Sequence, residues 1–171
     1  RNGEPIDLRH YEAVGTMTEA LSRHADEAFA ELPNERSRAL AEKIFKSLTE
    51  KGPDNREIRR PTKVAEIAAI AEASPEEVIA VIEPFRQTGR SFLMPPASVP
   101  LTADSLVDIS HESLIRGWER LRKWVDEEAR SANIYRRIAD TAILNSEGRA
   151  GLWHDPDLAL ALRWREENRP N

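Results

Sequence analysis

Apolar residues recur every three or four positions over most of the chain, which is the spacing of amphipathic helices. The stretch from Tyr11 to Leu32 has this spacing, and a glycine near its start favours a helix that begins at Thr16 or Thr18. A second apolar stripe runs from Glu35 to Lys51, before Gly52-Pro53. The pattern therefore predicts two helices in the first third of the chain.

The middle of the chain alternates short strand-like and helical patterns. Residues 56–60 resemble an edge strand, and residues 63–73 resemble a short helix. Ser74-Pro75-Glu76-Glu77 then combines a capping serine, a proline at the first helical position and a glutamate placed to close a capping box. We expect a fourth helix from here to Gly89, with a kink at Pro84 in its final turn.

Two further strands are predicted after this helix, at residues 90–94 and 106–109, around a proline-rich loop at residues 95–102. Beyond them, Leu114, Trp118, Leu121 and Val125 recur at helical spacing. The predicted helix continues past Trp118 until Gly148 interrupts it. Asp155-Pro156 begins one last helix, which we expect to fray from Glu166 to Asn171.

Three helices followed by a two-stranded hairpin are the layout of a winged helix-turn-helix. The fold class predicted is mostly α: a winged helix-turn-helix with a small β-hairpin wing, flanked by an N-terminal helix and a C-terminal helical region. The predicted domains are residues 1–33 (lead-in and helix), 34–110 (winged helix) and 111–171 (C-terminal helical region).

Composition narrows the choice of function. The 171 residues include no cysteine, which excludes disulfides and thiolate metal sites and fits a cytoplasmic protein. The four histidines have no paired-ligand spacing, and no apolar run is long enough to cross a membrane. The formal net charge of −5 argues against a nucleic-acid partner.

The charges also argue against the usual activity of a winged helix, which is DNA binding through its third helix. That predicted helix carries three acidic residues, Glu76, Glu77 and Glu83, and Arg86 as its one basic residue. Residues 95–102, the predicted wing loop, include no lysine or arginine. Helices that enter a groove of DNA need a positive surface beside the phosphates.

Catalytic motifs are absent from the sequence. The glycines stand apart, and none opens a phosphate-binding loop that ends in Gly-Lys-Ser or Gly-Lys-Thr. His24 with Asp26, and His154 with Asp155, are sequence neighbours that would not face each other on a helix. Because these motifs are missing, we expect that the chain is not an enzyme by itself. The start at Arg1 rather than Met predicts that it is part of a longer protein.

The strand-to-helix junction at residues 108–118 holds the candidate site. His111 is placed in, or just before, the first turn of the predicted helix. Ser110 is expected to accept a bond from the free backbone amides there, and Glu112 suits the positive end of the helix dipole. A helix N-terminus of this kind is a natural seat for a phosphate. From position alone, a plain capping-region histidine is the competing interpretation of His111.

The string Ile109-Ser-His-Glu-Ser-Leu-Ile-Arg-Gly-Trp118, with its continuation to Glu128, resembles the segment that closes the winged-helix domain of bacterial STAND-type (NACHT/NB-ARC-like) signalling NTPases, relatives of apoptosome and plant resistance proteins. The segments 11–25 and 136–139, with Trp153 and Trp164, resemble the flanking parts of that family. The resemblance covers about Tyr11 to Trp164, and its central string is the specific part.

The resemblance implies a regulatory module. In that family the winged helix packs on the NTPase core, and a histidine of a His-Asp motif contacts the β-phosphate of ADP. His111-Glu112 matches this motif with Glu in place of Asp, so His111, with Ser110 and Glu112, would contact the phosphate of ADP. The resemblance implies that the parent protein is an ATPase. The cofactor, ADP or ATP, would belong to that parent protein and not to the fragment.

The partners implied are an upstream NTPase core and a downstream repeat sensor, with oligomerisation on activation. Two alternatives stay open at this point. One is a DNA-binding transcription regulator with a winged helix-turn-helix and a helical dimerisation region. The other is a structural adaptor whose helices after Trp118 bind another protein, for which a large exposed apolar patch would be the mark.

Overall fold

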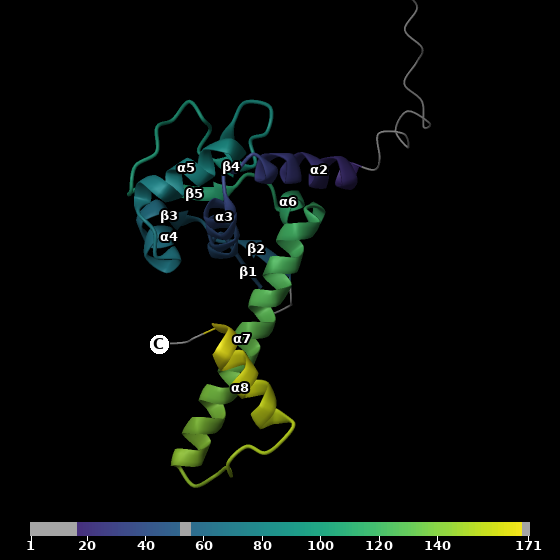
Figure 1. The fold of residues 1–171 in the computed structure, drawn as a ribbon, viewed down its shortest axis with the longest axis vertical. Helices are drawn as coiled ribbons and strands as arrows, with labels where there is room; N and C mark the ends of the chain where they lie inside the picture. The colour runs from purple at the N-terminus through teal and green to yellow at the C-terminus, as the bar shows by residue number, and fades with distance from the viewer. Residues whose placement is uncertain (1–16, 52–55, 169–171) are drawn as a thin grey trace, which may run out of the picture. The chain divides into compact units, whose positions relative to one another are not determined.

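The computed structural model describes residues 17–51 and 56–168 of the chain (Figure 1). Contacts group the chain into two compact units, Arg1–Val125 and Asp126–Asn171. Seven helices and five short strands lie in the described residues, so the mostly helical fold class is confirmed. Packing does not decide functional domains, and the boundaries predicted after residues 33 and 110 stay a prediction.

The first unit begins with helices α2 (Met17–Ala30) and α3 (Glu35–Ser47). The start of α2 lies between the two starts predicted, while the residues before Met17 lie outside the described part of the chain. Leu32 lies beyond the end of α2, but its side chain is only 2% exposed. Its burial explains why the apolar spacing of this helix continues to Leu32. Asn34 caps α3, because its side chain accepts a bond from the Ser37 amide at 2.8 Å.

The prediction that α3 continues to Lys51 is wrong. The helix ends at Ser47, and the next residues form strand β1 (Thr49–Lys51), paired antiparallel with β2 (Glu57–Arg59). The hydroxyl of Thr49 donates to the carbonyl of Phe45 at 2.9 Å and so replaces a backbone donor at the end of the helix. The strand predicted at residues 56–60 is confirmed in β2.

Helices α4 (Val64–Ala71) and α5 (Pro75–Arg86) follow the predicted pattern closely. The capping box is present: Ser74 accepts from the Glu77 amide at 3.2 Å, and the Glu77 carboxylate accepts from the Ser74 amide at 3.0 Å. Helix α5 stops at Arg86, short of the predicted end, because residues 87–90 turn the chain with Gly89 at φ +90°.

A three-stranded antiparallel sheet completes the first unit, in the order β3 (Thr62–Lys63), β5 (Leu106–Ile109), β4 (Leu93–Met94). The predicted strand at residues 106–109 is confirmed, and that at residues 90–94 is shorter than predicted. Strand β3, which is only two residues long, was not predicted. It lies directly before α4, where the helical pattern of residues 63–73 concealed it.

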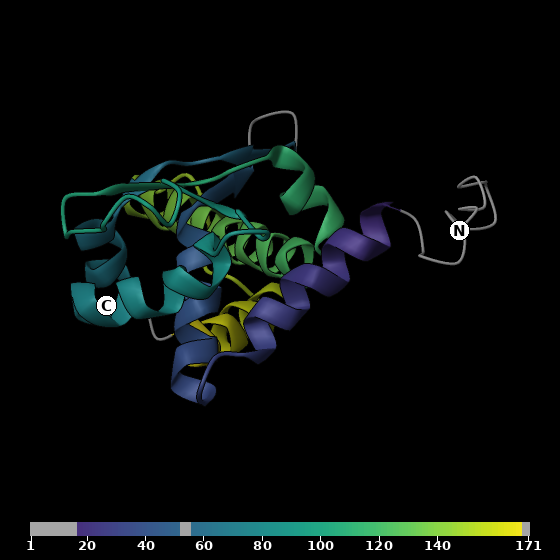
Figure 2. The same cartoon turned by 90° about the horizontal axis from the view of Figure 1, so that it is seen from above.

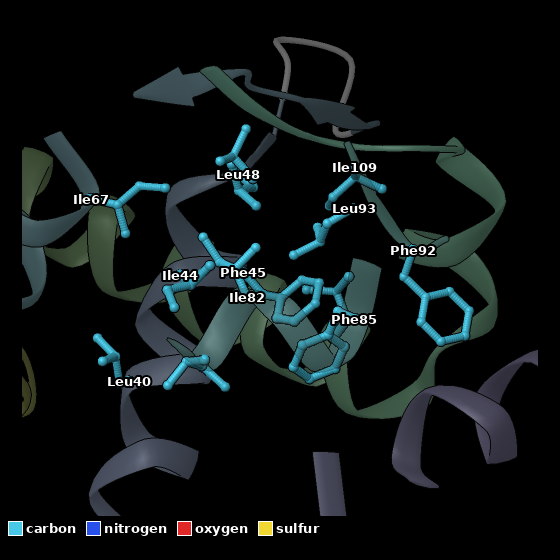
Figure 3. Close-up of a cluster of buried hydrophobic side chains, with 14 of the residues drawn as sticks. Leu40, Ile44, Phe45, Leu48, Ile67, Ile82, Phe85, Phe92, Leu93 and Ile109 are labelled. Carbon is cyan, nitrogen blue, oxygen red and sulfur yellow. The ribbon is translucent and has the colours of Figure 1, made fainter. Parts of the chain in front are cut away.

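The core of the first unit lies between the helices and this sheet (Figure 3). An aromatic group lies at its centre. The ring centroids of Phe45 and Trp118 are 4.9 Å apart, those of Phe45 and Phe85 are 5.0 Å apart, and those of Trp118 and Trp124 are 5.5 Å apart. Edge-to-face contacts of this kind add about 1 kcal/mol each to the burial of the rings.

The long helix predicted across Trp118 is divided into α6 (Glu112–Gly117) and α7 (Glu119–Ser146). Trp118 ends α6 with extended backbone angles, φ −84° and ψ 104°. Helix α2 packs against α6 in the first unit (Figure 2). The prediction of one continuous helix is therefore wrong, because Ser22 and Asp26 of α2 bind the residues at the break.

The second unit contains the rest of α7, from Asp126, and helix α8 (Asp157–Asn168). Gly148 at φ +70° follows the end of α7 as predicted, and α8 begins just after Asp155-Pro156 as predicted. Trp164 fixes the two helices together: its ring nitrogen donates to the Ser131 hydroxyl at 2.7 Å. The predicted fraying from Glu166 is not observed as far as Asn168, and residues 169–171 lie outside the described part.

Candidate functional site

His111 lies between the end of β5 and the start of α6, at the capping position of that helix. Its backbone is extended, with φ −142° and ψ 136°, and its carbonyl accepts the first helical bond from the Leu114 amide at 3.0 Å. The side chain is exposed and makes no capping bond. The imidazole is therefore free to contact a partner molecule.

The backbone that carries His111 is fixed on both sides. Before it, Ile109 is fully buried and the Ser110 amide donates to the Phe92 carbonyl at 2.9 Å. After it, Leu114 and Ile115 are 2% and 0% exposed. Because both flanks are anchored in the core, the imidazole is held outward on a rigid support, as a recognition residue needs.

Ser110 and Glu112 behave differently from each other. The capping position belongs to His111 and has no side-chain bond, so the predicted cap by Ser110 is wrong. Glu112 does lie in the first turn of α6, as predicted, and its carboxylate pairs with Arg116 at 3.1 Å. Helix α6 has only six residues, so its dipole adds little to an anion site.

Arg59 and Asp108, which comes three residues before His111, form a polar pair that the sequence did not reveal. The Arg59 guanidinium donates to the Asp108 carboxylate at 2.9 Å and to the Ile109 carbonyl at 2.8 Å. The second Asp108 oxygen is buried without a partner among the described residues. The two residues are 49 positions apart on strands β2 and β5, which belong to different sheets, so only the tertiary packing of the first unit brings them together.

Other kinds of site are not formed by the described residues. No three His, Asp or Glu side chains within residues 17–51 and 56–168 are grouped as metal ligands would be. In the same ranges, no helix combines the length and apolar character that crossing a bilayer requires. Surface cavities of about 540 and 420 Å³ lie in the first unit, and His111 lines neither of them.

Comparison with known proteins identifies the class. The model of a family described as novel STAND NTPase 1 matches residues 1–149 of the chain. The chain is therefore associated with the STAND-type NTPases. The match spans most of the 171 residues, so the chain belongs to the novel STAND NTPase 1 family. Searches of curated proteins and of solved structures gave no match.

Proposed function

We propose that this chain is the regulatory part of a STAND-like signal-transduction ATPase, in which His111 senses the nucleotide state. One observation carries the proposal: in a chain of this family, an exposed histidine without a side-chain capping bond stands on a rigid junction between β5 and α6. A neutral or protonated imidazole donates a hydrogen bond well to a phosphate oxygen. The ligand would be the β-phosphate of ADP bound by an upstream NTPase core.

The order of elements supports a winged helix-turn-helix as the framework of this sensor. Helix α3 is followed by β3, α4, α5, β4 and β5, with the three strands in one antiparallel sheet. Between α4 and α5, Glu72 adopts left-handed angles and turns the chain within three residues. Apart from the β1–β2 hairpin inserted after α3, this is the succession of a winged helix.

The structure gives no support to the alternative of a DNA-binding regulator. Arg86 is the one basic residue of α5, and its side chain is completely buried. Glu76 is exposed on the same helix, and Glu77 already pairs with Arg36 at 2.8 Å. A recognition helix without an available cation would meet the phosphates of DNA unfavourably.

The rest of the proposal concerns the parent protein. ADP or ATP would be held by the upstream core, and this chain would pack on that core without catalysing hydrolysis itself. A downstream repeat sensor would complete the protein, and loss of ADP would release the winged helix and permit oligomerisation. We also place the protein in the cytoplasm, because a chain without cysteine needs no oxidising compartment to form disulfides.

The test is calorimetric titration of ADP into the longer parent chain, with His111→Ala compared with the native protein. We expect at least a tenfold loss of affinity, which equals about 1.4 kcal/mol. His154→Ala is a matched control, since His154 is also exposed but lies in the second unit. Unchanged ADP affinity in a folded His111→Ala protein would refute the sensor role.

One observation favours the adaptor as a second candidate function. In the second unit Leu152 is 77% exposed, and Ile143 and Tyr135 are 58% and 55% exposed. Three leucines of α8 are also about two-fifths exposed: Leu158, Leu160 and Leu162. The test replaces these leucines by serine in the parent chain and measures binding to its isolated partner protein by titration. Loss of partner binding would support an adaptor. The same substitutions should leave the ADP affinity of a nucleotide sensor unchanged.

A further inference from the structure

The break between α6 and α7 is unexpected from the local sequence. No proline occurs from Glu112 to Ser146, and the buried residues Leu114, Trp118, Leu121 and Val125 have the spacing of one continuous helical face. Gly117 is the one residue of low helix propensity near the break. A break that the sequence does not require must be held by contacts from elsewhere in the fold.

Ser22 of α2 supplies one of these contacts. In a continuous helix the Glu119 amide would donate to the Ile115 carbonyl four residues earlier. It donates instead to the Ser22 hydroxyl at 3.3 Å, although Trp118 itself still bonds back to Leu114 at 2.9 Å. Ser22 thus acts as a capping side chain for α7, from a different helix.

Asp26, one turn further along α2, supplies the second contact. One of its carboxylate oxygens accepts from the Trp118 ring nitrogen at 3.0 Å and from the Arg120 guanidinium at 2.9 Å. Phe29, on the next turn, lies 4.4 Å below the Arg120 guanidinium carbon in a cation–π contact. Residues immediately before and after the break are therefore held by the same face of α2.

We propose that the junction at Trp118 is a hinge that α2 keeps bent. When the contacts of Ser22 and Asp26 are lost, α6 and α7 join into one helix from Glu112 to Ser146, with Trp118 still on the buried face. The joined state gives the amides of Glu119, Arg120 and Leu121 the intrahelical partners that the break denies them.

The junction also borders the surface of the first unit. A surface cavity of about 420 Å³ opens where α2, α6 and α7 meet, and it is lined by Ser22 and Asp26 from α2, by Gly117 from α6 and by Glu119 from α7. Lys123 pairs with Glu119 at 2.9 Å and lowers the pKa of that carboxyl. This i,i+4 pair lies within α7 and stays intact in both states of the hinge.

The test is amide hydrogen exchange, followed by NMR, on the full 171-residue chain. In the native protein the amides of Arg120 and Leu121 lie in the first turn of α7 and should exchange rapidly. In Ser22→Ala/Asp26→Ala they should exchange at least tenfold more slowly, because both become interior to one helix. Equal or faster exchange in a protein whose core amides stay protected would overturn the proposal.

A lock variant separates helix joining from other causes of slow exchange. Proline at position 119 suits the present structure, because it would occupy the first position of α7 and Trp118 already has the extended angles that a residue before proline adopts. In a joined helix the same proline would clash with the carbonyl of residue 115. Adding Glu119→Pro should restore rapid exchange at Arg120 and Leu121, and persistent slow exchange would contradict the hinge.

Should the double variant lose its core protection, Ser22→Ala alone provides the same comparison. It removes a single hydroxyl at the surface of α2 and leaves the ring nitrogen of Trp118 paired with Asp26. The expected result is slower exchange at Arg120 and Leu121, with a smaller change than in the double variant. A faster or unaltered rate would count against the proposal here too.

Discussion

Arg86 shows how one buried side chain fixes a whole loop. Its side chain has no exposed surface, and its guanidinium donates to the carbonyls of Pro95, Pro96 and Val99 at 2.6, 2.6 and 2.5 Å. A salt bridge to Glu83 at 2.6 Å completes the set. The sequence identified Arg86 only as the one basic residue of the predicted third helix of the winged helix, because nothing in its spacing reveals acceptors in a loop about ten residues later.

Replacing Arg86 by methionine should therefore destabilise the first unit. The change keeps the apolar part of the side chain but leaves three carbonyls without their donor, which costs about 3 kcal/mol in the free energy of unfolding. For a chain of this size Tm would fall by about 9 °C. Near-UV circular dichroism during heating measures this change.

Arg38→Met is the matched control for that measurement. Arg38 pairs with Glu35 across a single turn of α3 at the surface, and such pairs contribute about 0.5 kcal/mol or less. Its Tm should stay close to that of the native protein. If Arg86→Met were equally harmless, the loop at residues 95–99 would not depend on the guanidinium.

Elements fixed by interactions between residues close in sequence were predicted correctly, and elements fixed by distant residues were not. The start of α5 was predicted because all parts of its capping box lie within four residues, Ser74 to Glu77. The two-residue strand β3 was missed because it exists only by pairing with β5, more than forty residues later. The break at Trp118 was missed for the same reason, since Ser22 and Asp26 are more than ninety residues away.

The capping box also makes α5 sensitive to pH. The bond from the Ser74 amide, and then the bond from Arg36, lower the pKa of the Glu77 carboxyl below its ordinary value. A lowered folded-state pKa gives stability that is present above the unfolded value and is lost as the pH falls through the folded value. Glu77→Gln should thus lower Tm at pH 7, and the difference from the native protein should shrink at pH 3.

Glu76→Gln provides the comparison for this pH dependence. Glu76 lies on the same turn of α5 but makes no bond to the Ser74 amide. Its difference in Tm from the native protein should change less between pH 7 and pH 3. A Glu77→Gln difference that stays constant over this range would show that the charge of Glu77 does not contribute to the cap.

At the scale of the whole molecule, the two units differ in how much core each contains. Of the buried hydrophobic residues in the described part of the chain, Trp164 is the one that belongs to the second unit, and it is 9% exposed. Its ring lies 5.8 Å from that of Tyr135 and donates to Ser131. A unit with so small a core opens at low free energy, which is how regulatory elements commonly behave.

Trp164→Ala should accordingly remove amide protection from α8 and leave the first unit protected. The change deletes the buried ring that joins α8 to α7, and large-to-small changes of this kind cost about 3 to 5 kcal/mol, enough to unfold a unit with little other core. Trp118→Ala is the counterpart, because Trp118 is fully buried in the aromatic group of the first unit and should expose α3 and α5 to exchange. Hydrogen exchange with peptide resolution distinguishes the two patterns, and loss of protection in both units from Trp164→Ala alone would mean that they fold as one.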